Sequence, residues 1–206
     1  MMYFEKSVVR SGLIFLMVAG FLSACPTSLW ADEKPPIILD VILDQSAVEE
    51  IGGRAMKRHF FKTVEKASDI FYKEVGRRLV VGSVFVENPP LVSKSSKSIL
   101  LIPTIKWVDK RRGGLGDNRR LIFSATRLIY EDTTAQFFEE FAYGNFIFVR
   151  ILTNDHQRNV ANLLHGFGHS CGAAHSSDPN SLMNPEIFKA SSFGDMRDVI
   201  KKNCGG

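Results

Sequence analysis

Three histidines, His165, His169 and His175, carry the clearest chemical signal in this sequence. The first two are four residues apart in a segment whose apolar residues recur with helical spacing, so both side chains would project from one face of a helix. Gly172 follows them, and a glycine can adopt the positive φ that ends a helix and turns the chain back toward the same point. Three neutral nitrogen ligands with a fourth position open are typical of a catalytic zinc site. The sequence therefore predicts one zinc ion held by these three side chains.

The spacing of these residues is unusual enough to be informative. In a shuffled chain of this composition, the pattern H-x3-H-x2-G-x2-H would occur with a probability of roughly 2 in 10,000. Residues 159–185 resemble the metzincin zinc peptidases, whose signature is H-E-x-x-H-x-x-G-x-x-H followed by a turn that contains methionine. Within that family, the Ser-Ser-Asp sequence at 176–178 and the short path to Met183 are most similar to matrixins. The resemblance implies zinc ligation by the three histidines, a turn at Gly172 and an apolar floor beneath the metal at Met183.

One position departs from that signature, because Gly166 stands where the family has glutamate. In the family this glutamate is the general base, which takes a proton from the attacking water and delivers it to the leaving amine. Glycine can do neither, and loss of such a group typically costs about 10²–10⁴-fold in rate. Asp155 and Asp178 have no spacing that would place them on the water, and nothing in the sequence indicates that Glu139 or Glu140 reaches it. We therefore expect a zinc-binding domain that is catalytically inactive or strongly impaired.

Three classes of function stay open on these residues. The first is a pseudoenzyme that keeps zinc and binds peptides or proteins without cleaving them. The second is an active zinc metalloendopeptidase, or an altered form of one, that hydrolyses peptide bonds with water activated by zinc. The third is a binding or structural protein of the cell envelope in which zinc is incidental. The sequence does not decide whether Gly166 is a natural residue or an introduced one.

The elements that must position the site are predicted from hydrophobic patterning. Residues 37–43 form an apolar, β-branched run typical of a buried strand. From Ser46 to Val75 apolar residues recur at helical spacing, which predicts one amphipathic helix with Ser46 as its N-cap and Glu49 completing a capping box. Further strands are predicted at residues 79–86, 98–105, 120–129 and 146–152.

This order of elements, taken with the resemblance, predicts the fold class. We expect an α+β, zincin- or metzincin-like fold, in which a twisted mixed sheet packs against two long helices and a small C-terminal subdomain ends in a helix. The resemblance makes residues 146–152 the edge strand along which an extended peptide or protein ligand would pair.

The C-terminal residues predict a short last helix and leave one covalent question open. Ser192 and Asp195 resemble a capping box, and two glycines at 205–206 would end the helix. Cys171 and Cys204 could pair, because an exported protein can form disulfides. The alternative is that Cys171 is a small buried apolar residue and Cys204 a free thiol.

The first residues have the features of a secretory signal peptide. Lys6 and Arg10 precede an apolar run at residues 12–22 that is too short to span a bilayer comfortably. The run ends in Leu-Ser-Ala-Cys at 22–25, which resembles the lipobox of bacterial lipoproteins and implies lipidation of Cys25. The alternative is an ordinary signal that is cut further on, after Ala31.

These features predict the domain organisation and the location of the protein. We expect a lipoprotein-type signal peptide at 1–24, a tether at 25–36 and one domain at 37–206, with an N-terminal subdomain at 37–172 and a C-terminal subdomain at 173–206. A lipid on Cys25 would anchor the protein in the membrane of a bacterial cell envelope, and the Pro26 that follows favours the outer membrane. Without the lipid, the protein would be periplasmic or secreted.

Composition excludes several classes but identifies none. The 206 residues are 45% hydrophobic and 23% charged, which excludes a disordered chain and a polytopic membrane protein. The formal net charge of +4 is weak. The densest basic stretch, residues 106–120, lacks accompanying aromatic or helical periodicity and predicts a solvated loop rather than a nucleic-acid site. We therefore expect no nucleic-acid partner and a monomeric protein.

Overall fold

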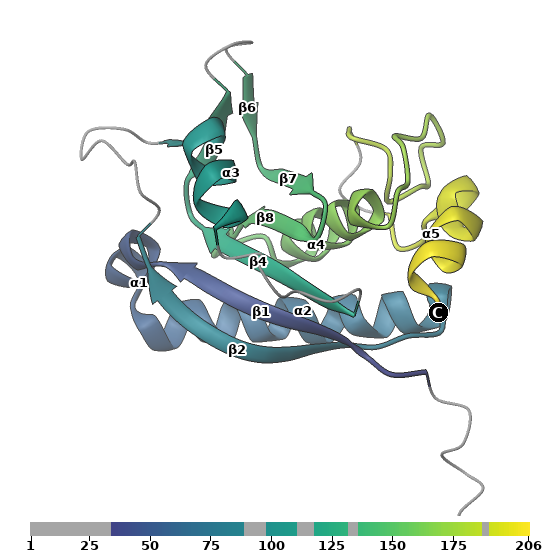
Figure 1. Cartoon of the computed structure of the whole chain (residues 1–206), viewed down its shortest axis with the longest axis horizontal. Helices are drawn as coiled ribbons and strands as arrows, with labels where there is room; N and C mark the ends of the chain where they lie inside the picture. The colour runs from purple at the N-terminus through teal and green to yellow at the C-terminus, as the bar shows by residue number, and fades with distance from the viewer. Residues whose placement is uncertain (1–33, 89–97, 111–117, 132–135, 187–189) are drawn as a thin grey trace, which may run out of the picture. The chain divides into compact units, whose positions relative to one another are not determined.

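Five strands form the sheet on which the predicted site rests (Figure 1). The computed structural model describes residues 34–88, 98–110, 118–131, 136–186 and 190–206, and residues 33–206 belong to one unit. The strands are β1 (Ile37–Asp44), β2 (Leu79–Glu87), β4 (Arg119–Ala125), β7 (Glu140–Tyr143) and β8 (Phe146–Arg150), in the order β2-β1-β4-β8-β7. Parallel pairing joins β2, β1, β4 and β8, and β7 pairs antiparallel with β8. The predicted signal peptide, Cys25 and most of the tether lie outside the described residues.

The sheet order corrects the predicted edge strand. Residues 146–152 were expected at the edge, but β8 ends at Arg150 and lies between β4 and β7. Phe146 to Val149 are all buried, as is typical of a strand inside a parallel sheet with both faces covered. The outermost strand on this side of the described sheet is β7, whose residues are half-buried or exposed.

A second, smaller sheet changes two other strand predictions. It contains β3 (Ser98–Leu100), β5 (Leu128–Glu131) and β6 (Gln136–Phe138), and α3 (Leu101–Asp109) follows β3 directly. The run at 98–105 is therefore a strand only as far as Leu100, and the run at 120–129 divides between two sheets. The expected basic loop at 106–120 also begins later, because α3 continues to Asp109. Short apolar runs do not distinguish a buried strand from a helix, which explains these errors.

The long helix predicted at 46–75 is broken near its start. It consists of α1 (Gln45–Ile51) and α2 (Gly53–Val75), separated by Gly52 at φ +85°. The N-cap is Asp44, whose carboxylate accepts a hydrogen bond from the backbone N–H of Ser46 at 3.4 Å. The predicted cap at Ser46 is thus wrong by two residues, because an aspartate at the end of β1 caps the helix first.

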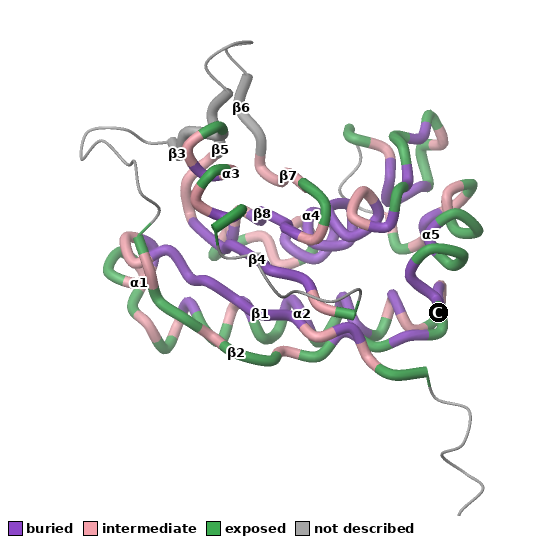
Figure 2. Tube along the Cα trace, viewed as in Figure 1, coloured by how far each residue is buried: buried purple, intermediate pink, exposed green. Residues whose placement is uncertain are grey.

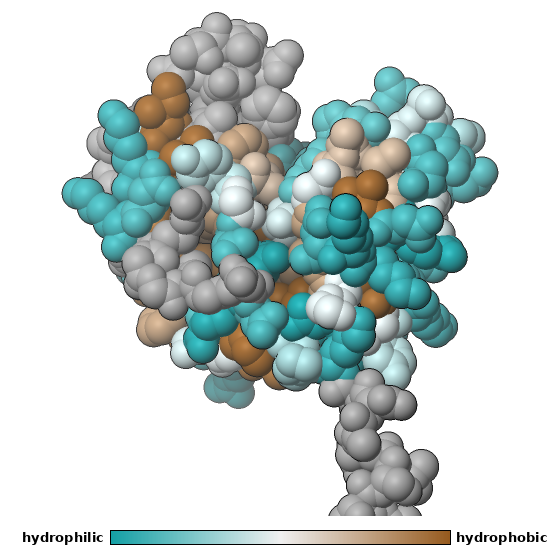
Figure 3. Space-filling view, turned by 45° about the vertical axis from the view of Figure 1, so that its right-hand side comes forward, coloured by the Kyte–Doolittle hydropathy of each residue, from teal (hydrophilic) through white to brown (hydrophobic). Residues whose placement is uncertain are grey.

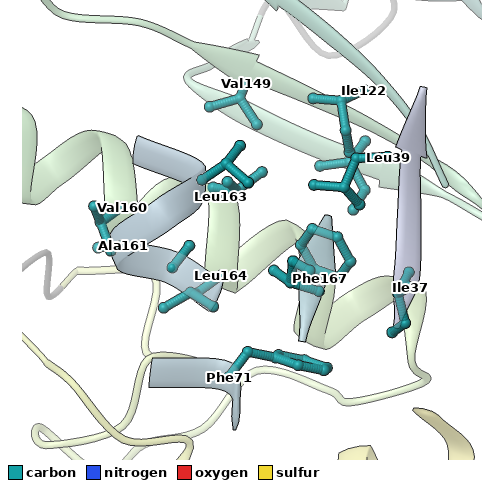
Figure 4. Packing of buried hydrophobic residues seen from close by; sticks show 14 of the residues in the cluster. Ile37, Leu39, Phe71, Ile122, Val149, Val160, Ala161, Leu163, Leu164 and Phe167 are labelled. Carbon is teal, nitrogen blue, oxygen red and sulfur yellow. The ribbon is translucent and has the colours of Figure 1, made fainter. Parts of the chain in front are cut away.

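The core lies where α2 and α4 (His156–Ser170) pack on the sheet (Figures 2 and 4). Phe71 of α2 packs against Phe167 of α4, with ring centroids 5.7 Å apart, and against Phe193 of the C-terminal segment at 6.0 Å. All three side chains are fully buried. The predicted α+β class with a mixed sheet and two long helices is confirmed. This aromatic packing joins α4 to α2 and α2 to the C-terminal segment.

The C-terminal segment is tied back to both long helices. A disulfide joins Cys171, just after α4, to Cys204 at the end of α5 (Arg197–Cys204). A 3-10 turn at Gly194–Met196 precedes α5 without a side-chain cap, so the expected capping box at Ser192 does not form. The Ser192 hydroxyl instead donates to Glu74 of α2 at 2.9 Å, and Glu74 also accepts from Arg197 at 2.8 Å.

The described surface is mixed in character. Hydrophilic residues predominate on the face in Figure 3, with smaller apolar patches between them. Among the described residues, none of the helices combines the length and the apolar character that crossing a membrane requires.

Candidate metal centre

The three predicted histidines lie together at the end of α4. The Nε2 atoms of His165 and His169 are 2.9 Å apart, and one nitrogen of each of the three rings lies within 4.8 Å of the others. The His175 ring centroid is 5.2 Å from that of His165 and 4.8 Å from that of His169. His165 is buried, His169 half-buried and His175 exposed, so the cluster opens toward solvent on the His175 side.

Backbone carbonyls orient two of the rings. His165 donates its Nδ1–H to the carbonyl of Leu182 at 2.8 Å, and His169 donates its Nδ1–H to the carbonyl of Ala173 at 2.9 Å. A carbonyl can only accept, so these contacts require the proton on Nδ1 of each neutral ring. Each Nε2 is therefore unprotonated and available as a metal ligand, which is the arrangement that supports ligating histidines in metal sites.

The surroundings also keep these rings neutral. Burial lowers the pKa of His165 to about 4, and the charge of the neighbouring His169 adds to the shift. Burial likewise lowers the pKa of His169. Metal ligands must be deprotonated, so near neutral pH protons compete little for these nitrogens. The donor set and its protonation state both suit a single zinc ion.

A left-handed glycine turns the chain back to the cluster. Gly172 has φ +83°, which a residue with a side chain rarely adopts, and it donates its backbone N–H to the carbonyl of His169 at 2.9 Å. The next residue, Ala173, donates to the carbonyl of Gly168 at 2.9 Å. These paired bonds end α4 sharply and direct the chain to His175, as the sequence predicted for Gly172.

Met183 packs against α4 at Gly168. It is fully buried in a tight turn, in which the Asn184 N–H donates to the carbonyl of Ser181 at 3.0 Å. Its sulfur occupies the space that a Cβ on Gly168 would need. The close approach of this turn to α4 therefore depends on a glycine one residue before His169. The requirement for Gly168 was missed in the sequence, where nothing separates it from an ordinary helix glycine.

The most informative difference from the predicted site is Glu140. Its Oε1 lies 3.7 Å from Nε2 of His165, and its buried Oε2 has no hydrogen-bond partner. Burial raises the pKa of Glu140 to about 7. The sequence offered no indication that Glu140 reaches the histidines, because this contact depends on the pairing of β7 with β8.

The adjacent acid has a different environment. Glu139 accepts hydrogen bonds from Arg150 at 3.1 Å and from Arg158 at 2.6 Å. Asn162 of α4 donates to the same carboxylate at 3.3 Å. Glu139 is therefore fully occupied in holding α4 against β8, whereas Glu140 faces the histidine cluster.

Gly166, which replaces the expected glutamate, is buried against the sheet. A Cβ at this position would lie 2.6 Å from Cγ2 of Ile147 and 3.7 Å from Oε2 of Glu140. The first distance is too short for two carbons, so the close packing of α4 on β8 uses the absence of a side chain here. At Gly166, α4 therefore packs closely against Ile147 of β8.

Comparison with solved structures identifies the architecture. No family model and no curated protein sequence matches this chain. A zinc-dependent peptidase from Methanocorpusculum labreanum superposes with a TM-score of 0.57 at 13% identity, covering 79% of this chain and 99% of that one. An archaemetzincin from Methanopyrus kandleri superposes with a TM-score of 0.55 at 18% identity, covering 82% and 95% of the two chains. An archaemetzincin from Archaeoglobus fulgidus, complexed with malonate, gives 0.51 at 17% identity, covering 79% and 99%.

This chain has a zincin-like fold. At these identities the likeness shows the fold alone. The zincin-like core presents His165 and His169 from α4 and His175 from the segment after Gly172, as described above.

Proposed function

We propose that this chain is a zinc-binding domain of the metallopeptidase type, with one zinc ion held by His165, His169 and His175. The observation that carries the proposal is the pair of backbone contacts that leave Nε2 of His165 and His169 unprotonated and facing each other at 2.9 Å. Three imidazoles with one open side are the ligand set of a catalytic zinc site rather than a structural one. The solved structures with this fold include a zinc-dependent peptidase.

The substrate class follows from the strand beside the site. Zinc bound there would supply a Lewis acid that lowers the pKa of water and polarises a carbonyl. The outermost strand on one side of the described sheet is β7, and its first residue, Glu140, lies next to His165. An extended peptide can add to the outermost strand of a sheet by main-chain hydrogen bonds. The ligand in this proposal is therefore a peptide or unfolded protein segment that pairs along β7, in place of residues 146–152.

The finer features belong to the same proposal and rest on sequence. The buried Met183 beneath the helix end supports a matrixin-like arrangement. The signal at 1–24 and lipidation of Cys25 support export to a bacterial envelope, with an outer-membrane anchor or a periplasmic or secreted form. A monomer without a nucleic-acid partner completes this description.

A second candidate is a zinc-dependent peptide-binding domain without turnover. Gly166 favours it, because the helix carries no acid–base group beside the first ligand. The two candidates share the zinc site and differ only in whether a bound peptide is cleaved.

Metal analysis tests the shared part of the proposal. We expect the purified protein to bind close to one zinc ion per chain, and His169→Ala to abolish tight binding. The matched control is His59→Ala, because His59 lies on α2 away from the cluster and should leave zinc content unchanged. Absence of zinc in the parent protein after loading would favour a structural envelope protein instead.

A further inference from the structure

The carboxylate of Glu140 is positioned by strand β7 rather than by the helix α4, which carries His165 and His169. Glu140 is the first residue of β7, where its backbone pairs opposite Val149 of β8. Its side chain extends toward α4, so that Oε1 lies 3.7 Å from the ligand nitrogen of His165. This carboxylate is not one of the three ligand groups that cluster within 4.8 Å of one another. It therefore lies beside the metal position, where water or a substrate group would approach.

One oxygen of this carboxylate is left without a partner. Oε2 of Glu140 is buried from solvent and makes no hydrogen bond, whereas both oxygens of neighbouring Glu139 are bonded. A buried acceptor that is unsatisfied costs about 1–3 kcal/mol, and more when it is charged. Such a group calls for an explanation, for example a catalytic role or a bound water or ion. The donor that is missing here would come from the molecule that enters the site.

Oε2 of Glu140 also lies close to Gly166, the position that has no side chain. Oε2 of Glu140 is 3.7 Å from where a Cβ on residue 166 would lie, which is within the reach of a glutamate side chain from its own Cβ. A glutamate on residue 166 would have to pass Ile147, whose Cγ2 is 2.6 Å from that Cβ. The packing thus disfavours a side chain at residue 166, and the carboxylate of Glu140 lies beside the space that such a side chain would enter.

We propose that Glu140 supplies, from strand β7, the general acid–base carboxylate that α4 lacks at Gly166. This inference rests on the proposed zinc site and deepens it. Glu140 accepts a proton from the attacking water as the water oxygen bonds to the carbonyl carbon of the peptide. The C–N bond then breaks, and Glu140 returns the proton to the leaving amine nitrogen. The products are a carboxylic acid and an amine, and no other reactant is consumed.

The test is a charge-removing substitution that preserves shape. Glu140→Gln is compared with the parent protein and with Glu65→Gln, a control at an exposed position of α2. All three proteins are loaded with zinc, and their zinc content is measured. Cleavage is then followed with a mixture of quenched-fluorescent peptides, in which every residue type occurs on both sides of the scissile bond. We expect equal zinc content in the three proteins and a loss of about 10²–10⁴-fold in kcat for Glu140→Gln alone.

A binding measurement provides a readout that does not depend on turnover. A short peptide hydroxamate carries a hydroxyl group. The carboxylate of Glu140, which lies beside the metal position, can accept a hydrogen bond from that hydroxyl. We expect Glu140→Gln to weaken hydroxamate binding by about tenfold or more, the equivalent of one lost hydrogen bond to a charged group. The absorption spectrum of the cobalt-substituted protein should keep its tetrahedral character in Glu140→Gln, because the three histidine ligands are unchanged.

The outcomes separate this inference from the zinc site itself. Full activity in Glu140→Gln would overturn the role of Glu140. The role would also be overturned if the zinc-loaded parent protein cleaved no peptide and bound the hydroxamate no better than Glu140→Gln does. Loss of zinc in Glu140→Gln would identify Glu140 as a fourth ligand and would also overturn it. Failure of the parent to bind zinc would instead overturn the proposed function on which it rests.

Discussion

At the scale of single residues, Gly166 has two consequences that the sequence alone could not connect. It removes the acid expected after the first ligand, and it allows Ile147 of β8 to pack against the backbone of α4. A chemical loss and a packing gain therefore occur at one position. The direct reversal Gly166→Glu would meet Ile147 before its carboxylate reached the metal position.

A smaller substitution tests this packing. Gly166→Ala should destabilise the protein by about 1–3 kcal/mol, because the overpacking cost at the stiff, β-branched Ile147 exceeds the gain in helix propensity. In the background of Ile147→Ala the same change should be neutral or stabilising, since the methyl group that blocks the new Cβ is absent. Urea denaturation of the four proteins in this cycle measures the coupling. Equal effects of Gly166→Ala in both backgrounds would contradict the contact.

The residues that sequence predicted best are those whose geometry is local. Two histidines four apart on a helix must share a face, and a glycine three residues later can end that helix, so His165, His169 and Gly172 needed no knowledge of the rest of the chain. Glu140 could not be predicted in this way. Its approach to His165 depends on which strand pairs with β8 and in which register, and these are long-range properties.

At the scale of elements, the end of α4 is defined by what packs against it on two sides. The sheet approaches at Gly166, and the turn that contains Met183 approaches at Gly168. Both contacts require a residue without a side chain. This requirement accounts for two glycines in α4, although glycine lowers the stability of a helix interior. The helix is thus held between the sheet and the turn, with the ligands on the remaining face.

Gly168→Ala tests the second contact. The new Cβ would overlap the sulfur of the fully buried Met183, so we expect a loss of about 1–3 kcal/mol in stability and weaker zinc binding, because the turn also positions the carbonyl that orients His165. Gly53→Ala is the matched control, since its Cβ would meet only Val48 at an ordinary distance of 3.4 Å. Thermal unfolding and zinc titration of both variants provide the measurements. Similar behaviour of the two variants would show that Met183 adapts at no cost.

The errors in the element predictions have a common physical origin. The run at 98–105 was apolar enough for either a strand or a helix, and the run at 120–129 is strand in both halves but divides between two sheets, a division that its composition does not reveal. The edge position assigned to 146–152 was wrong because four successive buried residues are typical of an interior strand. Helix periodicity persists over many residues and predicted α2 and α4 well, whereas sheet order leaves little trace in the sequence of any one strand.

At the scale of the whole molecule, a disulfide and several hydrogen bonds connect the C-terminal segment to the rest of the fold. The disulfide Cys171–Cys204 closes it onto the end of α4, and Glu74 of α2 binds both Ser192 and Arg197. The guanidinium of Arg77 donates to the carbonyl of Cys204 at 2.9 Å. Sequence offered the disulfide as one of two alternatives, because two cysteines 33 residues apart carry no information about their separation in space.

Removal of the disulfide should lower stability without abolishing the fold. For a loop of this length the loss on Cys171→Ser with Cys204→Ser is about 3–4 kcal/mol, mainly because the unfolded chain regains freedom. Urea unfolding of the oxidised parent, the reduced parent and the double variant measures it. The reduced parent should match the double variant, and reductant should have no effect on the variant. A parent protein that is insensitive to reductant would contradict the disulfide.

The two carbonyl contacts and the disulfide also bear on how the protein handles its metal. His165 and His169 are oriented by backbone groups, and the chain after them is held by a covalent bond, so the orientation of these two rings rests on contacts within the protein itself. Acquisition of the ion therefore does not have to be coupled to folding, in contrast to small domains that fold only around their metal. We therefore expect a chelator to remove the ion from the folded protein, and added zinc to restore it, while the fold persists.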